Sequence, residues 1–340
     1  MAKQSVLIVC PGRGTYGAAE LGSLARYAGH HDLARFDAMR AEAGAPTISE
    51  LDGTASFSAA MHAVGSNAAP LIYAAGWLDF LSLDHDRFNV VAVTGNSMGW
   101  YTALACAGAV SGEHGFAIAD AMGTHSGRHG DGGQLLVSLV GEDWRFDPAL
   151  RAEVLDRAVR HDTLLSIDLG GMLVLAGEAS ALTALARALP ALPGRAPMKL
   201  AGHGPFHTPL MSESSRAALE TLPTTWFGQP QVPLIDGTGR IWHRHATDPA
   251  ALHGYTFIDQ ILQPYDFAAA VSVGLKEFAP DRIVLIGPGD TLGGAIGQIL
   301  VREGWLGMRD KAAFAQQQAS DPFLIAMGRE DQRALAQSAG

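Results

Sequence analysis

A serine stands at the centre of a Gly-x-Ser-x-Gly stretch, GNSMG, at residues 95–99. The preceding residues, VVAV at 90–93, predict a short buried strand, and the following WYTALACAGAV has the spacing and composition of a helix. On such a strand-to-helix turn a serine can act as a nucleophile, because the turn lifts its Oγ clear of the sheet. The first N–H groups of the helix can stabilise a developing oxyanion. Ordinary Gly/Ser turns share this pattern, so the motif alone does not identify a catalytic serine. A catalytic Ser97 would also need a base from elsewhere in the chain.

A second glycine-rich turn, PGRGTYG at 11–17, follows a predicted strand at 5–10. Its spacing formally fits the G-x-G-x-x-G dinucleotide fingerprint, which also requires a second strand ending in an acidic residue about twenty positions further on. The sequence around residue 37, ARFDAMRAEA, has a helical pattern instead. We therefore favour the other use of such a turn, which is to present backbone N–H groups beside the serine and complete an oxyanion hole.

The elements that must position these turns alternate between short apolar strands and longer helical patterns. This alternation predicts parallel strands joined by helical crossovers. The segments are the strands at 5–10, 90–93 and 232–237, the helices at 67–83 and near 256–278, and a strand-turn-helix unit at 282–300.

The middle of the chain has a different pattern, because residues 132–203 are typical of a β-α-β-β-α-β series, the ferredoxin-like plan. We therefore predict an α/β protein whose hydrolase-like parallel-sheet domain comprises residues 1–130 and 204–308. A ferredoxin-like subdomain is inserted at 131–203. A polar, alanine-rich tail at 309–340 is expected to form a loose helix.

Composition excludes several classes of function. The 340 residues carry a net charge of −10, which argues against nucleic-acid binding. The mean hydropathy is +0.11, but the apolar runs are far too short to span a membrane. Cys10 and Cys106 both lie in apolar runs and are expected to be buried thiols in a reducing cytoplasm. The thirteen histidines are scattered, and we expect pairs such as His30 and His31 to be surface residues, with no metal site.

Four motifs together resemble the malonyl-CoA:acyl carrier protein transacylase family, including the acyltransferases of polyketide synthases. They are PGRGTYG at 11–17, GNSMGWYTALACAGAVS at 95–111, PFHTPLM at 205–211 and GPGDTLGG at 287–294. Their order is that of the family, they surround the predicted insertion, and the resemblance covers roughly residues 5–302. It implies an enzyme that moves an acyl group between thioesters through an acyl-serine intermediate.

The resemblance also implies catalytic roles for individual residues. Ser97 would be the nucleophile, and His207 of PFHTPLM would take its proton and return it to the leaving thiol. The backbone N–H groups of Met98 and Arg13 would form the oxyanion hole. In the family a backbone carbonyl orients the histidine, and the matching stretch here places Asp266 at that position. Either the backbone carbonyl or the side-chain carboxylate of Asp266 would orient His207.

Departures from the family pattern concern the acyl group. Met122 stands where the family has the arginine that grips the malonyl carboxylate, Asn96 replaces a histidine, and Arg13 replaces a glutamine. Phe206 resembles the aromatic residue that accompanies unbranched malonyl units, and SIDLG at 166–170 replaces an asparagine-rich wall. Because methionine cannot bind a carboxylate, we predict an acyl group without one.

The sequence thus predicts a transferase whose donor is a thioester of coenzyme A or of an acyl carrier protein, and whose acceptor is an acyl carrier protein. It needs no cofactor beyond the phosphopantetheine of its substrates, and we expect a monomer. Three alternatives stay open. They are a malonyl-CoA:acyl carrier protein transacylase with Arg13 as replacement cation, an editing hydrolase of acyl carrier thioesters, and a non-catalytic carrier-binding protein.

Overall fold

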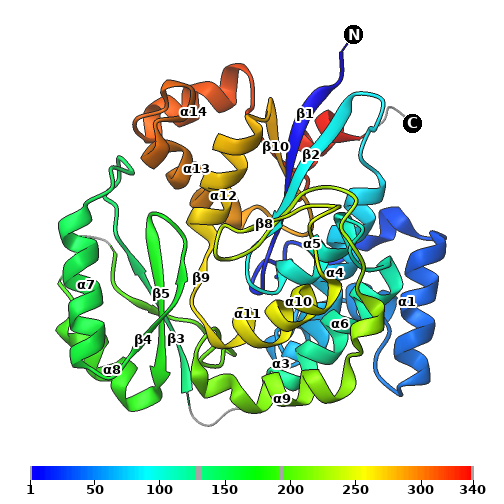
Figure 1. The fold of residues 1–340 in the computed structure, drawn as a ribbon, viewed down its shortest axis with the longest axis horizontal. Helices are drawn as coiled ribbons and strands as arrows, with labels where there is room; N and C mark the ends of the chain where they lie inside the picture. The colour runs from blue at the N-terminus through cyan, green and yellow to red at the C-terminus, as the bar shows by residue number, and fades with distance from the viewer. Residues whose placement is uncertain (1, 128–131, 191–194, 338–340) are drawn as a thin grey trace.

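A six-stranded sheet forms the centre of the larger part of the structure, a computed structural model (Figure 1). The structure describes all residues except 1, 128–131, 191–194 and 338–340. The strand order is β11-β10-β1-β2-β7-β8, and all neighbours are parallel except β7 and β8. The strands are β1 (Gln4–Cys10), β2 (Phe88–Gly95), β7 (Leu234–Ile235), β8 (Ile241–Trp242), β10 (Arg282–Leu285) and β11 (Leu324–Ala326). The predicted parallel strands at 5–10, 90–93 and 282 onwards are confirmed.

Helices cover both faces of this sheet, and the unbroken apolar run VLIVC at residues 6–10 of β1 reflects that double burial. Val6 and Ile8 pack in one core with α4 (Gly65–Leu81), α5 (Gly99–Cys106) and α6 (Gly112–His125). Leu7 and Val9 point to the opposite face and pack with α12 (Phe267–Phe278) and α13 (Thr291–Glu303). Figure 1 shows these two groups of helices on either side of β1 and β2.

The inserted segment folds as a second sheet beside the first, with strand order β6-β3-β5-β4-β9. Its elements are β3 (Gly132–Ser138), α7 (Pro148–Arg160), β4 (Leu164–Asp168), β5 (Met172–Glu178), α8 (Ala179–Ala188) and β6 (Met198–Lys199). The predicted β-α-β-β-α-β order is therefore present. Leucines and valines of β3 and β5 form a core with α7 and α8, so the other face of this sheet is turned toward the large sheet.

The fifth strand of the second sheet comes from outside the insertion. β9 (Tyr265–Asp266) pairs in parallel with β4, through Ile167 opposite Tyr265 and Asp168 opposite Asp266. The single helix predicted near 256–278 is wrong, because β9 interrupts it. Pro264 disfavours helical backbone at the residue before it, and Gln263 is extended, with φ −115° and ψ 154°. The helical pattern therefore divides into short pieces before β9 and α12 after it.

The C-terminal segment is part of the fold, so the prediction of a loose helix is wrong. It forms α14 (Lys311–Ser320), β11 and α15 (Glu330–Ala336). β11 is buried and extends the large sheet beside β10. Arg333 of α15 forms a 2.5 Å ion pair with Asp79 of α4, and both side chains are almost completely buried. Edge-strand pairing and this ion pair hold the segment against the large sheet.

The remaining helices complete the larger part. They are α1 (His31–Glu42), α2 (Ile48–Asp52), α3 (Ala59–His62), α9 (Ser212–Thr221), α10 (Pro249–Gly254) and α11 (Gln260–Leu262), with a π-helical turn at Tyr255–Asp259 between the last two. Within the described residues, none of the helices combines the length and apolar character that crossing a bilayer requires.

Candidate active site

Ser97 lies on a strained turn between β2 and α5. Its φ of 54° is in the left-handed region, which non-glycine residues rarely occupy unless the surroundings impose it. The flanking glycines are required for close packing: a Cβ on Gly99 would lie 2.2 Å from the carbonyl oxygen of Cys10, and one on Gly95 would lie 2.3 Å from the carbonyl oxygen of Gly99. The strand-turn-helix geometry predicted from GNSMG is confirmed.

His207 reaches this serine from a distant part of the chain. Its Nε2 lies 2.7 Å from Ser97 Oγ, and its Nδ1 lies 2.6 Å from the carbonyl oxygen of Gln260. Because a carbonyl oxygen only accepts hydrogen bonds, Nδ1 carries the proton and Nε2 is free to accept from the serine hydroxyl. The pair therefore has the geometry of a nucleophile and its general base.

The residue that orients His207 is Gln260, so the prediction for Asp266 is wrong. The Asp266 carboxylate accepts from the N–H of Ala269 at 2.7 Å and caps α12 instead. Gln260 begins the short α11, and the helix end that follows leaves its carbonyl without a partner inside the helix. Its side-chain Nε2 also donates to the carbonyl of Ser97 at 3.0 Å. Gln260 thus holds both members of the pair.

Burial sets the protonation state of His207. It lowers the pKa of this histidine to about 4, although the hydrogen bond to the Gln260 carbonyl opposes the shift. The imidazole is therefore neutral near pH 7 and able to accept a proton.

The glycine-rich loop after β1 lies against the serine turn, as predicted. A Cβ on Gly12 would lie 2.6 Å from the carbonyl oxygen of Asn96. Among the hydrogen bonds of the described residues, none has the backbone N–H of Arg13 or Met98 as its donor. These two N–H groups are available for an oxyanion at Ser97, the role predicted for them.

A cavity of about 60 Å³ opens beside Ser97 and His207. Its lining is mainly apolar and includes three of the predicted substrate-binding residues, Met122, Phe206 and Arg13. Asn96, the fourth, does not line it. We refer to this space as the Met122 cavity.

Arg13 brings a positive charge to the Met122 cavity. Its guanidinium donates through Nη2 to the carbonyls of Ala63 and Gly202, both at 3.1 Å, and its Cζ lies 5.2 Å from the ring centre of Phe206. Burial lowers the pKa of Arg13 to about 10, which leaves it charged at neutral pH. Within the described part of the chain, no carboxylate forms an ion pair with it.

A second and larger cavity, of about 310 Å³, lies on another side of Ser97. It runs between the serine turn, the Arg13 loop and the face of the second sheet that is turned toward the large sheet. We call it the inter-sheet cavity; it contains Asn96, and its apolar wall includes Leu136, Ile167, Leu169, Val174 and Leu200. Ser97, Arg13 and Phe206 line both cavities, so the nucleophile stands where the two meet.

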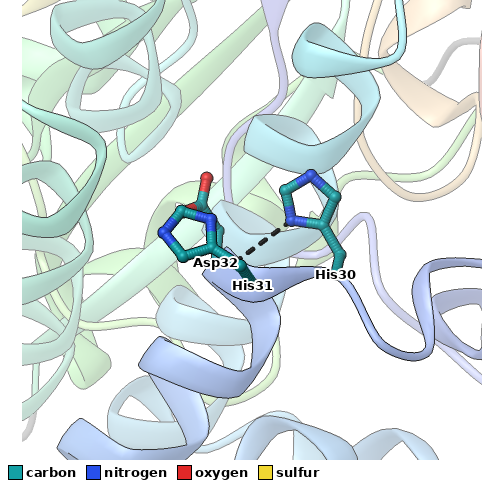
Figure 2. A group of neighbouring side chains, drawn as sticks. All are labelled: His30, His31 and Asp32. Atoms are coloured by element: carbon teal, nitrogen blue, oxygen red, sulfur yellow. Dashed lines mark hydrogen bonds and ion pairs between the residues drawn. The ribbon is translucent and has the colours of Figure 1, made fainter.

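Figure 2 shows a separate group at the start of α1, formed by His30, His31 and Asp32, whose potential ligand atoms lie within 4.8 Å of one another. His30 Nδ1 accepts from the N–H of Asp32 at 3.1 Å and thereby caps the helix. The His31 side chain is largely exposed. His31 Nδ1 lies 3.0 Å from a carboxylate oxygen of Asp32, so a helix cap and a contact between side chains bring the three residues together.

Comparisons with known proteins bear on the fold. No protein-family model matches the chain, and no curated protein sequence matches it significantly. A malonyl-CoA:acyl carrier protein transacylase from Xanthomonas oryzae superposes with a TM-score of 0.75 at 21% identity, covering 99% of this chain and 100% of that one. The malonyl-transacylase in complex with its type II polyketide synthase acyl carrier protein gives 0.74 at 19% identity, covering 98% and 99%.

Two further structures extend this likeness. The transacylase from Mycobacterium tuberculosis gives a TM-score of 0.69 at 25% identity, with 87% of this chain and 93% of that chain covered. The acyltransferase domain from the second module of the salinomycin polyketide synthase gives 0.68 at 21% identity, covering 97% and 70%. The family resemblance carried by the four sequence motifs is therefore matched by the whole architecture, and the chain has the fold of the malonyl-CoA:acyl carrier protein transacylases.

Proposed function

We propose that the protein is a serine acyltransferase that moves an acyl group between the pantetheine thioesters of coenzyme A and an acyl carrier protein. The observation that carries this proposal is the 2.7 Å contact between Ser97 Oγ and an imidazole nitrogen whose opposite nitrogen is held by the Gln260 carbonyl. The fold and the names of the similar structures, which are transacylases acting with acyl carrier proteins, support the same reading.

The reaction consists of two half-reactions, acylation of Ser97 and transfer of the acyl group to an acceptor thiol. Ser97 Oγ attacks the thioester carbonyl while its proton passes to Nε2 of His207, and the N–H groups of Met98 and Arg13 stabilise the oxyanion. The C–S bond then breaks, the thiolate takes the proton from His207, and acyl-Ser97 remains. An acceptor thiol repeats the sequence in reverse and leaves as the new thioester, which regenerates the Ser97 hydroxyl without any added cofactor.

One experiment separates this proposal from its rivals. The protein is mixed with an acyl-CoA and the holo form of an acyl carrier protein, and the products are resolved by mass spectrometry. Acyl transfer to the carrier supports a transferase, whereas free acid as the main product would identify an editing hydrolase. If neither product forms and Ser97 stays unmodified, the protein is a non-catalytic carrier-binding protein.

Two candidates remain for the acyl group. Met122 supports an acyl group without a carboxylate, because the flexible thioether packs well against an alkyl chain. The charged guanidinium of Arg13 in the same cavity supports malonyl instead. An ion pair with a substrate carboxylate would supply the partner that this buried cation lacks among the described residues.

Competition between acetyl-CoA and malonyl-CoA for Ser97 decides between the two candidates. We expect malonyl to acylate the enzyme only with help from Arg13, so Arg13→Gln should slow malonyl acylation about tenfold or more and change acetyl acylation little. Intact-mass kinetics provide the measurement. Faster acetylation of the wild type supports the neutral acyl group.

A gain-of-function variant serves as the matched control. Met122→Arg in the Arg13→Gln background restores a cation on the opposite wall and should recover malonyl acylation. If Arg13→Gln leaves both rates unchanged, Arg13 does not contact the acyl group, and the malonyl candidate loses its support.

A further inference from the structure

A second histidine, His203, lies beside the candidate active site and has no role in the chemistry proposed above. It lies in the loop between β6 and His207 and lines the inter-sheet cavity together with Ser97. Its ring packs at a tilt against Phe206, with 5.7 Å between the ring centres. The side chain is therefore held in place next to the reacting atoms.

A chain of hydrogen bonds determines which nitrogen of His203 carries the proton. The hydroxyl of Ser166 donates to the carbonyl of Phe206 at 2.7 Å, so its oxygen must accept from Gln134, whose Nε2 lies at 2.6 Å. The Gln134 amide is thereby oriented with Oε1 toward His203 Nδ1, at 2.8 Å. Since Oε1 only accepts, Nδ1 is the protonated nitrogen and Nε2 is an acceptor.

The surroundings keep this Nε2 available. Among the described residues it has no hydrogen-bond partner. Burial, aided by the nearby charge of Arg13, lowers the pKa of His203 to about 4, so Nε2 stays unprotonated in neutral solution. A hydrogen-bond acceptor in a mainly apolar cavity binds most favourably to a neutral N–H or O–H donor that enters with a substrate.

The arrangement of the two cavities indicates which donor this is. A thioester held at Ser97 has an acyl side and a thiol side, and two cavities meet at Ser97. The Met122 cavity is the smaller and contains the residues predicted to face the acyl group, so we assign the thiol side to the inter-sheet cavity. In every pantetheine thioester the first polar group on the thiol side is the amide N–H of the cysteamine unit.

We propose that Nε2 of His203 accepts a hydrogen bond from the cysteamine amide N–H of the pantetheine arm, and so helps to place each thioester against Ser97. This inference rests on the proposed acyl transfer. It makes His203 a substrate-binding residue and makes Gln134 and Ser166 positioning residues, which fix its tautomer so that Nε2 is the acceptor.

The test uses two small thioesters that differ in one group. One is an acetyl thioester of N-acetylcysteamine, which has the amide N–H, and the other is the acetyl thioester of 2-acetoxyethanethiol, in which an ester oxygen replaces that N–H. We expect wild-type protein to be acylated about tenfold faster by the amide compound, measured as kcat/KM from intact-mass kinetics.

Two variants of His203 separate binding from a structural role. In His203→Asn the side-chain amide can still donate to Gln134 but has no atom at the position of Nε2. In His203→Gln an amide oxygen can occupy that position, while the bond to Gln134 is lost. We expect His203→Asn to abolish the preference for the amide compound and His203→Gln to retain part of it.

The opposite order of the two variants in their preference for the amide compound would overturn the proposal. If His203→Asn keeps the wild-type preference, or if both compounds slow equally in both variants, His203 only supports the loop that carries His207. A preference that appears only with a hydroxyl on the acyl chain, tested with a 3-hydroxybutyryl thioester, would move the donor to the acyl side. Failure of every thioester to acylate wild-type Ser97 would instead contradict the proposed function.

Discussion

Ser97→Ala will form no acyl adduct when the protein is incubated with an acyl-CoA, whereas the wild-type chain will gain the mass of one acyl group. The substitution removes the only atom that the proposed chemistry acylates, Ser97 Oγ, and leaves the cavities on both sides in place. Loss of a nucleophile that acts as one unit with its base typically lowers the rate on the order of 10⁶-fold. Intact mass followed by peptide mapping provides the measurement.

Ser97→Cys is the matched control for this experiment. It keeps a nucleophile of similar size on the same turn, next to the neutral imidazole of His207, and we expect it to accept an acyl group on its thiol. An adduct that persists in Ser97→Ala, or that maps to another residue in the wild type, would contradict the assignment of Ser97.

His207→Ala will slow acylation of Ser97 by about a hundredfold or more, the usual scale for loss of a general base. The alanine cannot accept the serine proton that Nε2 accepts across the 2.7 Å contact. Pre-steady-state measurement of the acyl adduct reports this step directly. A variant that is acylated at a near-normal rate would exclude His207 as the base.

The pH dependence of acylation gives an independent check on His207. Its pKa is lowered to about 4, so the imidazole gains a proton only in acid. The acylation rate constant should therefore be level around neutral pH and fall to about half near pH 4 as Nε2 becomes protonated. A midpoint near pH 6.5, the ordinary value for histidine, would mean that the imidazole is far more solvated than the structure shows.

Asp266→Asn is the control that separates the two ways of orienting His207. The Asp266 carboxylate caps α12, and an asparagine side chain caps a helix about as well, so both fold and acylation rate should change little. In a triad that used this carboxylate, the same substitution would favour the wrong tautomer and reduce the rate strongly.

Local patterns in the sequence predicted the strands and the serine turn, and the family resemblance of PFHTPLM predicted His207 as the base. The apolar run at residues 5–10 predicted a buried strand, and the packing of Val6 and Leu7 in separate cores follows from the alternation of side chains along it. The crowding around Gly95 and Gly99 explains why the turn that carries Ser97 has such a recognisable sequence. These features depend on neighbouring residues, and so they can be read from short motifs.

Tertiary structure alone decided which group orients His207. The role belongs to the main-chain carbonyl of Gln260, and a carbonyl carries no side-chain signature by which a motif could reveal it. Its availability depends on where α11 ends, which Pro264 controls from four positions further along the chain. Asp266 was predicted because a carboxylate can be identified from the residue type, whereas every residue has a main-chain carbonyl and the sequence does not show which one is free.

The same limit applies to the pairings made between distant segments. Arg13 and Phe206 are far apart in the chain and contact each other only because the loop after β1 meets the loop after β6. The tautomer of His203 depends on Gln134 and Ser166, which two different strands of the second sheet supply. Arg333 and Asp79 are far apart in the chain and form their ion pair in a fold where β11 pairs with β10 at the sheet edge. The sequence by itself predicted the buried parallel strands and the serine turn from local periodicity, and predicted the reactive histidine from a motif shared with a known family. The charges, carbonyls and acceptor nitrogens around them were decided by the packing of segments whose proximity exists only in the folded chain.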